Sequence, residues 1–536
     1  MEYMGIKNLR SLHETPLLPI TPIVFLVGRN SSGKSTFLRS LPLLRQSLEQ
    51  KTKGPLLWYG PYVDFGSFGD SISRVADSNT ISFRFSMTVS PGAFRRASRL
   101  FSRSYFFGMG MPAVHEPIPV DLTFVIASPK TGTTSISEIY LKILGNRVEL
   151  RIDPHSKKSR IIVNDQPVLP DSTIFSESTQ FGLLPRLYVT SDVQSERYMP
   201  PRLALVEKLL LNAASHVSSF THGHTSDETH LAIASQVPIS SREAFKENLL
   251  AIKSAPKSWQ QQITKTDVES EQFRRLCNAC IAARVPTLID IANEYFGQYF
   301  SSVQYLKPLR ATAERYYRQQ DLAVEEIDSQ GANIPMYLDS LSTEARSDLA
   351  EWLTKFFHFS VKSYRSEGHI ALRVREEPHD WESNLADMGF GYSQILPLAV
   401  QLWDVARRSR RTTRRHVLEL NVPTTIAVEQ PELHLHPQLQ ARVADAFASV
   451  VSSRGGGSTK REPNVNLLVE THSRQIINRV GHLVARGNLN ASDVTILLFD
   501  RDEFAGSTDV RIATFDAEGV LQDWPFGFFE ATPRES

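Results

Sequence analysis

The segment GRNSSGKST, residues 28–36, contains the first set of residues that could do chemistry. It matches the pattern G-x-x-x-x-G-K-[ST], in which glycines allow a tight backbone path that turns N–H groups toward phosphates. Lys34 would neutralise the β- and γ-phosphates, and the Ser35 hydroxyl would be a ligand of Mg²⁺. The sequence therefore predicts a site for ATP with Mg²⁺ as cofactors.

The second segment, TTIAVEQPELHLHP at 424–437, is an apolar strand that ends in acidic residues and histidines. Glu429 stands at the strand's tip, where a carboxylate that organises magnesium is expected. Gln430 follows, where a carboxylate that activates water is usual. Glutamine can orient water but cannot accept its proton, and losing a general base typically costs about 10²–10⁴-fold in rate. The sequence predicts an ATPase with slow turnover, for which Glu432 or His472 could still supply a base.

Two more segments complete the candidate site. DMGFGYSQILPLAVQLW, residues 387–403, places Gly389, Gly391 and Ser393 at the start of an amphipathic helix, and such a helix N-terminus can cap a phosphate. NLLVETHS, residues 466–473, is a buried strand followed by His472, which we expect to reach a γ-phosphate.

These segments need a scaffold of strands and helices. Residues 2–10 and 22–28 have the pattern of strands, and the second runs into the glycine-containing loop, after which we expect a helix from Lys34 to about Gln50. Period-two strands separated by turns fill 60–190 and predict an antiparallel meander. Helical periodicity covers 200–350, and strands alternating with helices return after 365. The predicted fold class is α/β, with an antiparallel meander in the first lobe and a mainly helical insert. The expected division is residues 1–199, 200–350 and 351–536.

Composition sets broad limits. The chain has 536 residues with 59 Lys+Arg against 58 Asp+Glu, so any contact with nucleic acid would come from local patches. Its two cysteines argue against a disulfide framework, and neither a signal peptide nor an apolar run of about eighteen residues is present. We therefore expect a soluble, cytoplasmic protein.

Local clusters leave alternatives open. The arginine-rich stretches 95–103 and 407–415 are either solvated loops or contacts to nucleic acid or protein. Cys277 and Cys280 have a metal-like or redox-like spacing, but a helical setting favours two cysteines on one packing surface. No Toprim-like acidic constellation follows the last strand, so we expect no nuclease activity within these residues.

The order of phosphate loop, insert, glycine–serine cap, acidic strand and histidine resembles the ABC-type ATPases of the SMC, Rad50 and OLD group. The resemblance implies that the fold is a P-loop ABC-type ATPase head. It also implies a head-to-tail homodimer in which the cap of one subunit closes over the ATP of the other. It also implies that Ser35 and Glu429 organise magnesium, that Glu429, Gln430 and His472 are catalytic, and that His434–Pro437 is the D-loop. The residues implied to hold nucleotide are Gly28, Asn30, Ser31, Gly33, Lys34, Ser35, Thr36, Gly391 and Ser393.

Four strings carry a closer resemblance, to the PtuA ATPases of the Septu and retron-associated anti-phage systems: LLWYGPYVDFGSFGD, YLKPLRATAERYY, EQPELHLHP and DWPFGFFE. That resemblance implies a partner HNH nuclease and, in retrons, a reverse transcriptase with its RNA–DNA hybrid (msDNA). The alternative is a DNA-repair or chromosome-organising ATPase of the SMC or Rad50 kind. Against it, residues 200–350 lack the long heptad runs of a coiled-coil arm.

Overall fold

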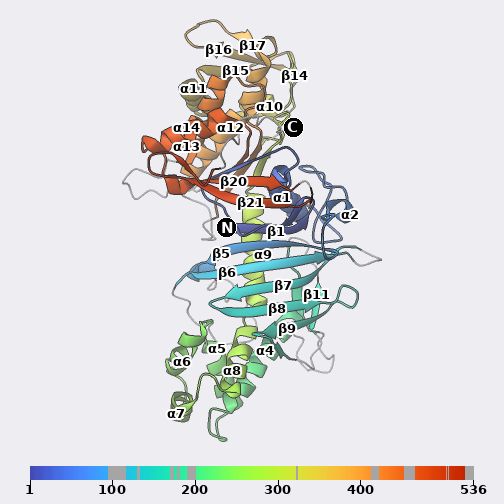
Figure 1. Cartoon of the computed structure of the whole chain (residues 1–536), viewed down its shortest axis with the longest axis vertical. Coiled ribbons are helices and arrows are strands. Elements are labelled where there is room, and N and C mark those ends of the chain that lie inside the picture. Colours follow the sequence, from blue (N-terminus) through green and yellow to red (C-terminus); the bar gives the residue numbers. More distant parts are fainter. Residues whose placement is uncertain are drawn as a thin grey trace.

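The computed structural model is an elongated molecule built around two large sheets (Figure 1). A mainly parallel sheet with helices α10–α14 forms one end, an antiparallel sheet occupies the middle, and helices α4–α8 form the other end. This arrangement confirms the predicted α/β fold class. The structure describes residues 1–93, 116–128, 133–169, 174–177, 182–189, 201–320, 324–411, 422–451, 465–502, 504 and 506–524, without the side chains of 201–203 and 409–411.

The middle sheet is the predicted antiparallel meander, with the strand order β12-β11-β9-β8-β7-β6-β5-β1-β2. Strand β8 shows why it forms: Val148, Leu150 and Ile152 are buried, while the arginines and glutamate between them point the other way. One face of the sheet is thus apolar and can cover a core. The strands are β1 (Tyr3–Leu9), β2 (Leu12–Glu14), β3 (Leu18–Pro19), β5 (Thr80–Val89), β6 (Ile118–Ala127), β7 (Ser135–Ile143), β8 (Asn146–Ile152), β9 (Lys158–Val163), β10 (Gln166–Val168), β11 (Ile174–Glu177) and β12 (Arg186–Tyr188).

The second sheet has the order β13-β18-β19-β4-β20-β21-β22, in which the first five strands are parallel and the last two antiparallel. Its central strands are buried along their whole length, as expected of a parallel sheet covered on both faces. The strands are β4 (Ile23–Gly28), β13 (Gln304–Leu306), β18 (Thr424–Glu429), β19 (Val465–Glu470), β20 (Val494–Arg501), β21 (Thr508–Phe515) and β22 (Leu521–Gln522).

This sheet separates two hydrophobic cores. Along β4, Val24 and Leu26 face the core shared with the meander, whereas Ile23, Phe25 and Val27 face the core under α12–α14. The alternation follows from the period of two along a strand. The helices that cover the sheet are α1 (Lys34–Glu49), α12 (Phe390–Arg411), α13 (Pro437–Val451) and α14 (Arg474–Ala485). A short helix, α2 (Phe68–Ser71), follows α1 in the chain.

Short helices capped by serine form the far end of the molecule (Figure 1). Ser226, Ser241 and Ser270 each accept a hydrogen bond from a backbone N–H of the first helical turn that follows. The helices are α4 (Pro201–Ser218), α5 (Asp227–Gln236), α6 (Arg242–Leu250), α7 (Lys257–Lys265) and α8 (Glu271–Ala282).

Helix α9 (Val285–Ser301) runs from this helical end along the meander toward α1 (Figure 1). Phe296 and Phe300 pack against Phe85 of β5, with ring centroids 5.0 and 5.9 Å apart. Immediately after α9, β13 joins the parallel sheet beside β18. The range 200–350, expected to be a mainly helical insert, thus also contains a strand of the parallel sheet.

A small antiparallel sheet and two helices lie at the end of the molecule opposite helices α4–α8 (Figure 1). The HIALRV segment lies here, in β16, rather than in the parallel sheet. The elements are β14 (Tyr317–Arg318), α10 (Ile334–Ser340), α11 (Thr343–Phe357), β15 (Phe359–Ser366), β16 (His369–Glu376) and β17 (Ser383–Asn384), followed by a 3₁₀ turn at Leu385–Asp387. A second 3₁₀ turn, Ala491–Asp493, directly precedes β20.

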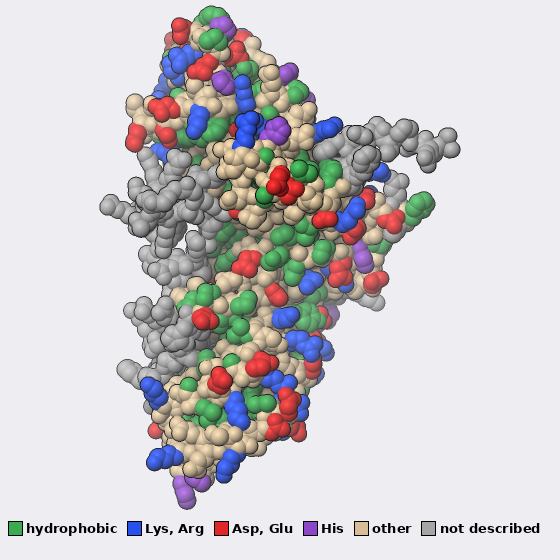
Figure 2. Space-filling model, turned by 60° about the vertical axis from the view of Figure 1, so that its left-hand side comes forward, with side chains coloured by type: hydrophobic (Ala, Val, Ile, Leu, Met, Phe, Trp, Pro, Cys, Tyr) green, Lys and Arg blue, Asp and Glu red, His purple; other side chains and the backbone are tan. Residues whose placement is uncertain are grey.

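The structure decides only some of the open alternatives. Cys277 and Cys280 are buried in α8, where burial raises the pKa of both thiols, to about 12 for Cys280; this confirms the packing interpretation. The stretch 95–103 lies outside the described residues, as do residues 412–415 of the second stretch and the side chains of 409–411. Figure 2 shows acidic and basic side chains interspersed over the displayed face.

No helix in the described ranges is both long enough and apolar enough to cross a lipid bilayer.

Candidate nucleotide-binding site

The predicted phosphate loop connects β4 to α1, and α1 begins at Lys34. The Lys34 side chain is buried, and its Nζ donates to the carbonyl oxygens of Gly28 at 3.0 Å and Arg29 at 2.7 Å. Burial lowers the pKa of Lys34, and nearby Glu470 and Glu432 oppose that shift. The ammonium is therefore held inside the curve of the loop, as phosphate binding requires.

Both glycines of the motif are required by their surroundings. Gly33 has a φ of 94°, and a Cβ there would lie 2.7 Å from Oγ of Ser11. A Cβ on Gly28 would lie 2.3 Å from the carbonyl oxygen of Phe499 in β20. The close approach of β20 thus explains Gly28, and the left-handed backbone with Ser11 close by explains Gly33. Of the other predicted loop residues, Asn30 and Ser31 are exposed, whereas Thr36 is buried.

Two glutamates end neighbouring parallel strands beside this loop. Glu429 of β18 and Glu470 of β19 are register partners, and β19 lies between β18 and β4. The Ser35 hydroxyl donates to Oε1 of Glu470 at 2.9 Å. The structure therefore brings Ser35 to Glu470, not to Glu429 as the sequence predicts.

Glu429 is instead held by an arginine and a tyrosine. Arg39 of α1 donates from Nε and Nη2 to its two carboxylate oxygens at 2.6 and 2.7 Å, and the Tyr305 hydroxyl donates to Oε1 at 2.6 Å. The Glu429 side chain is 3% exposed and that of Arg39 33% exposed. Hydrogen bonding to Glu429 raises the pKa of Arg39, and burial raises that of Tyr305. The charge of Glu429 is thus compensated within the protein.

Glu470 differs from its neighbour in this respect. It is 3% exposed, and among the described residues its Oε2 has no hydrogen-bond partner. Burial, then the adjacent Glu429 carboxylate, raises its pKa. Such an environment favours a nearby cation.

The donor set fits magnesium. Mg²⁺ prefers oxygen ligands and in phosphate sites takes one or two from the protein, the rest coming from phosphate and water. Ser35 and Glu470 supply a hydroxyl and a carboxylate at one point of the loop. No group of three or more His, Cys, Asp or Glu in the described ranges is arranged as a metal site.

The turn after β18 carries the residues expected to act on water. Gln430 has a φ of 42°, and its N–H donates to the carbonyl oxygen of Glu470 at 2.8 Å. Glu432 accepts from the Thr471 hydroxyl at 2.9 Å and from the N–H of His472 at 2.6 Å, and burial raises its pKa. Partial desolvation of the His472 ring, and then the nearby charge of Lys34, lowers the pKa of His472. The turn therefore joins both predicted catalytic segments, Gln430 and His472, through Glu432.

The glycine–serine cap starts α12, as predicted. Ser393 is buried and donates to the carbonyl oxygen of Phe390 at 2.7 Å. A Cβ on Gly391 would lie 3.1 Å from the carbonyl oxygen of His434, so the cap packs closely against the expected D-loop. The half-exposed Phe390 ring meets the His434 ring edge-on at 4.9 Å.

Arg310 joins this cap to the acidic strand. Its backbone N–H and carbonyl pair with the side-chain amide of Gln394 at 3.3 Å each, and its Nη2 donates to the carbonyl oxygen of Glu429 at 3.3 Å. Burial lowers the pKa of Arg310 to about 10, and Glu432 opposes that shift. Residues next to Ser393 and at the tip of β18 thus share one buried contact.

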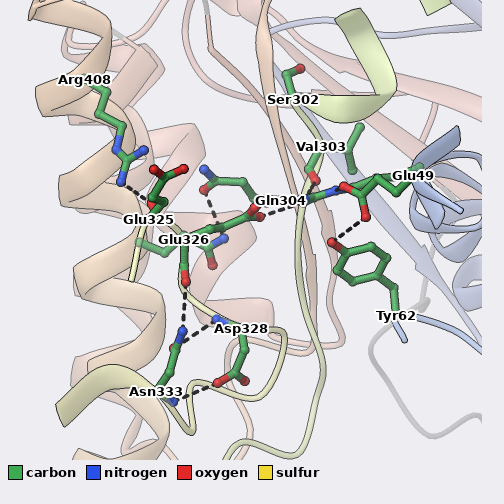
Figure 3. A network of polar contacts seen from close by, with 12 residues as sticks. Glu49, Tyr62, Ser302, Val303, Gln304, Glu325, Glu326, Asp328, Asn333 and Arg408 are labelled. Atoms are coloured by element: carbon green, nitrogen blue, oxygen red, sulfur yellow. Dashed lines mark hydrogen bonds and ion pairs between the residues drawn. The ribbon is translucent and has the colours of Figure 1, made fainter. Parts of the chain in front are cut away.

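A second network links the helices that start at the phosphate loop and at the cap (Figure 3). Arg45 of α1 donates to both carboxylate oxygens of Glu326 at 2.6 Å and to the carbonyl oxygen of Val303 at 2.5 Å. Next to it, Glu325 accepts through its carbonyl from Arg408 of α12. Gln401 of α12 also donates to Gln304 of β13 at 3.0 Å. The segment after β13 therefore holds α1 and α12 in a fixed position relative to each other, through Glu326 and Glu325.

Sequence reasoning missed three residues of this site: Arg39, Tyr305 and Glu470. Glu470 had a signal, because NLLVE ends in glutamate as TTIAVE does. Arg39 and Tyr305 had none, since their contact with Glu429 spans 390 and 124 positions of sequence.

Residues 224–477 match a family model described as an AAA ATPase domain, slightly less than half of the chain. The match includes the start of α12, β18 and β19, whereas the phosphate loop lies before it. The matched segment is thus similar to an ATPase domain. No curated protein matches.

Several solved structures of SMC heads align with nearly the whole chain. The SMC head domain from Thermotoga maritima is 8% identical, with a TM-score of 0.34, over 95% of this chain and 97% of that one. A Smc head with an extended coiled coil, bound to the C-terminal domain of ScpA from Pyrococcus furiosus, is 10% identical, with a TM-score of 0.33 and 96% coverage of each chain. A further Smc head, bound to the C-winged helix domain of ScpA, is 9% identical at the same score, over 96% and 97% of the chains.

Proposed function

We propose that this protein binds Mg–ATP, hydrolyses it slowly, and uses the bound nucleotide to clamp two copies of the chain head to tail. The observation that carries the proposal is the convergence of Lys34, Ser35 and Glu470 at the carboxyl ends of parallel strands, with the Gln430 turn beside them. Ligands of open α/β sheets bind at this edge of the sheet.

In this proposal each group of residues has a separate role in binding or hydrolysing ATP. The loop amides and Lys34 bind the phosphates, and bound magnesium would neutralise charge on the phosphate oxygens. Gln430 orients the attacking water by hydrogen bonding, and His472 contacts the terminal phosphate. The cap at Ser393 closes over nucleotide held by the second copy. Because glutamine takes up no proton, the ATP-bound dimer is long-lived.

The dimer gives a direct prediction. Gly389, just before α12, is exposed, and a Cβ there meets no atom within 4 Å, so Gly389→Arg should fold normally. We expect this variant to bind ATP like the unaltered chain but to remain monomeric with Mg–ATP, because the arginine obstructs the cap. Lys34→Met should lose both ATP binding and dimerisation. Calorimetry measures binding, and light scattering after size exclusion measures mass.

Gly223→Arg is the matched control, since Gly223 is equally open but lies between α4 and α5 at the far end. It should dimerise with Mg–ATP. If Gly389→Arg dimerises as well, the cap is not the interface. If the unaltered chain binds no ATP, the proposed function fails.

We further propose that this switch is the scaffold of an anti-phage complex that restrains a partner HNH nuclease, with a reverse transcriptase and its RNA–DNA hybrid in a retron setting. The support is the resemblance of four strings to the PtuA ATPases, of which EQPELHLHP lies at the site itself. A chromosome-organising ATPase would need a long coiled-coil arm, and the longest helix within the described residues is α12, with 22 residues.

The partner proposal predicts what accompanies the protein in its host. Affinity purification at low salt, followed by mass spectrometry and nuclease-sensitive staining, should recover an HNH nuclease in a fixed ratio to the chain. Lys34→Met, purified in parallel, should recover less of it, because the clamped dimer does not form. Recovery of kleisin-like or repair proteins in place of a nuclease would favour the chromosome-organising alternative.

A further inference from the structure

The two glutamates at the ends of β18 and β19 are not equivalent. They are neighbours in register, and each is 2–3% exposed. Two adjacent buried carboxylates repel each other, so the protein must neutralise at least one of them. Arg39 does this for Glu429, with bonds to both of its oxygens.

Glu429 is poorly placed to gain another partner. Oε1 already accepts from Arg39 and Tyr305, and Oε2 accepts from Arg39. A bound cation would compete with the guanidinium for the same lone pairs, and breaking a buried ion pair is strongly unfavourable.

Glu470 has the opposite properties. Its Oε1 faces the Ser35 hydroxyl at 2.9 Å, and within the described residues its buried Oε2 has no partner. Buried polar atoms without partners are rare and are often explained by a bound ion or water. Lys34, whose ammonium already bonds two loop carbonyls, is near enough to interact with it electrostatically.

We propose that Glu470 and Ser35 together are the protein's ligands for the divalent cation that accompanies the nucleotide. Glu429, bound by Arg39 and Tyr305, instead has a structural role at the end of the neighbouring strand. This inference rests on the proposed function, because the cation arrives with ATP. It assigns the metal role to the end of β19, where the sequence had indicated the end of β18.

The test measures cation binding rather than turnover. ATP affinity is determined with EDTA and with Mg²⁺, and Mn²⁺ is used as a probe whose EPR signal changes on binding. The unaltered chain should bind ATP more tightly with Mg²⁺. Glu470→Gln, which keeps an oxygen for Ser35, should bind ATP equally well in EDTA but lose at least about tenfold in Mn²⁺ affinity. Glu429→Gln should keep the response to the cation.

Because Glu429→Gln leaves Arg39 without its partner, it could unfold. The double variant Arg39→Met/Glu429→Gln removes both members of the pair and serves as the second test; it too should keep the response to the cation. The inference is overturned if Glu470→Gln responds to Mg²⁺ and Mn²⁺ like the unaltered chain, or if the double variant loses the response. Absence of ATP binding by the unaltered chain, with and without cation, would instead refute the proposed function.

Discussion

Replacing Gln430 by glutamate is expected to raise the rate of ATP turnover by about 10²–10⁴-fold, the usual effect of a general base. Glutamine and glutamate have the same shape, and both would adopt the left-handed backbone conformation seen at this position, with a φ of 42°. The N–H of residue 430 would still donate to the carbonyl oxygen of Glu470. The substitution therefore gives side chain 430 the ability to accept a proton without changing the backbone conformation or hydrogen bond of that residue.

The affinity for ATP should change little, because Lys34 and the loop amides supply it. Steady-state phosphate release gives turnover, and calorimetry gives affinity. Gln438→Glu is the matched control: it adds the same charge at an exposed position of α13, the helix that follows the turn, and should leave turnover unaltered.

A flat or lower rate in Gln430→Glu would mean that another residue is the base. Glu432 is the first alternative, since burial raises the pKa of its carboxyl toward the range of a general base. However, both of its oxygens already accept hydrogen bonds, from Thr471 and from the N–H of His472. Glu432→Gln in the unaltered chain would distinguish the cases, because it should lower turnover sharply only if Glu432 is the base.

Replacing Arg39 by methionine is expected to destabilise the ATPase lobe by about 3 kcal/mol. Removing one partner of a buried ion pair costs about 3–5 kcal/mol, and the lower end applies because the Arg39 side chain is 33% exposed. Glu429, 3% exposed, would keep only the hydroxyl of Tyr305. Urea unfolding followed by tryptophan fluorescence measures the loss, because Trp403 is buried in the core that packs against the strand of Glu429.

Two variants test the cause of that loss. Arg242→Met breaks an exposed pair with Glu269 of similar length, 2.6 Å, and should cost less than about 1 kcal/mol. Adding Glu429→Gln to Arg39→Met should restore much of the stability, because no uncompensated carboxylate remains buried. Equal losses from Arg39→Met and Arg242→Met would contradict the importance of the buried pair.

The sequence determined the parts of this protein that depend on neighbours along the chain. Period-two patterns predicted the meander strands β5–β9, and the apolar run before Gly28 predicted β4 and the start of α1. Gly33 could be identified from the sequence because its left-handed conformation requires glycine, and this glycine is part of the short motif G-x-x-x-x-G-K-[ST]. The segment around β13 shows the limit: it is three residues long and follows a helix, so no periodicity indicated that it pairs with β18.

Tertiary structure alone decided how the charges are shared. Glu429 and Glu470 end similar apolar strands, and nothing in the sequence shows which of the two carboxylates Arg39 neutralises. The choice follows from the strand order β18-β19-β4, which places Glu470 next to the phosphate loop, and from α1, which carries Arg39 across to Glu429. Electrostatic pairing depends on distance in space, and these partners lie hundreds of residues apart in the chain.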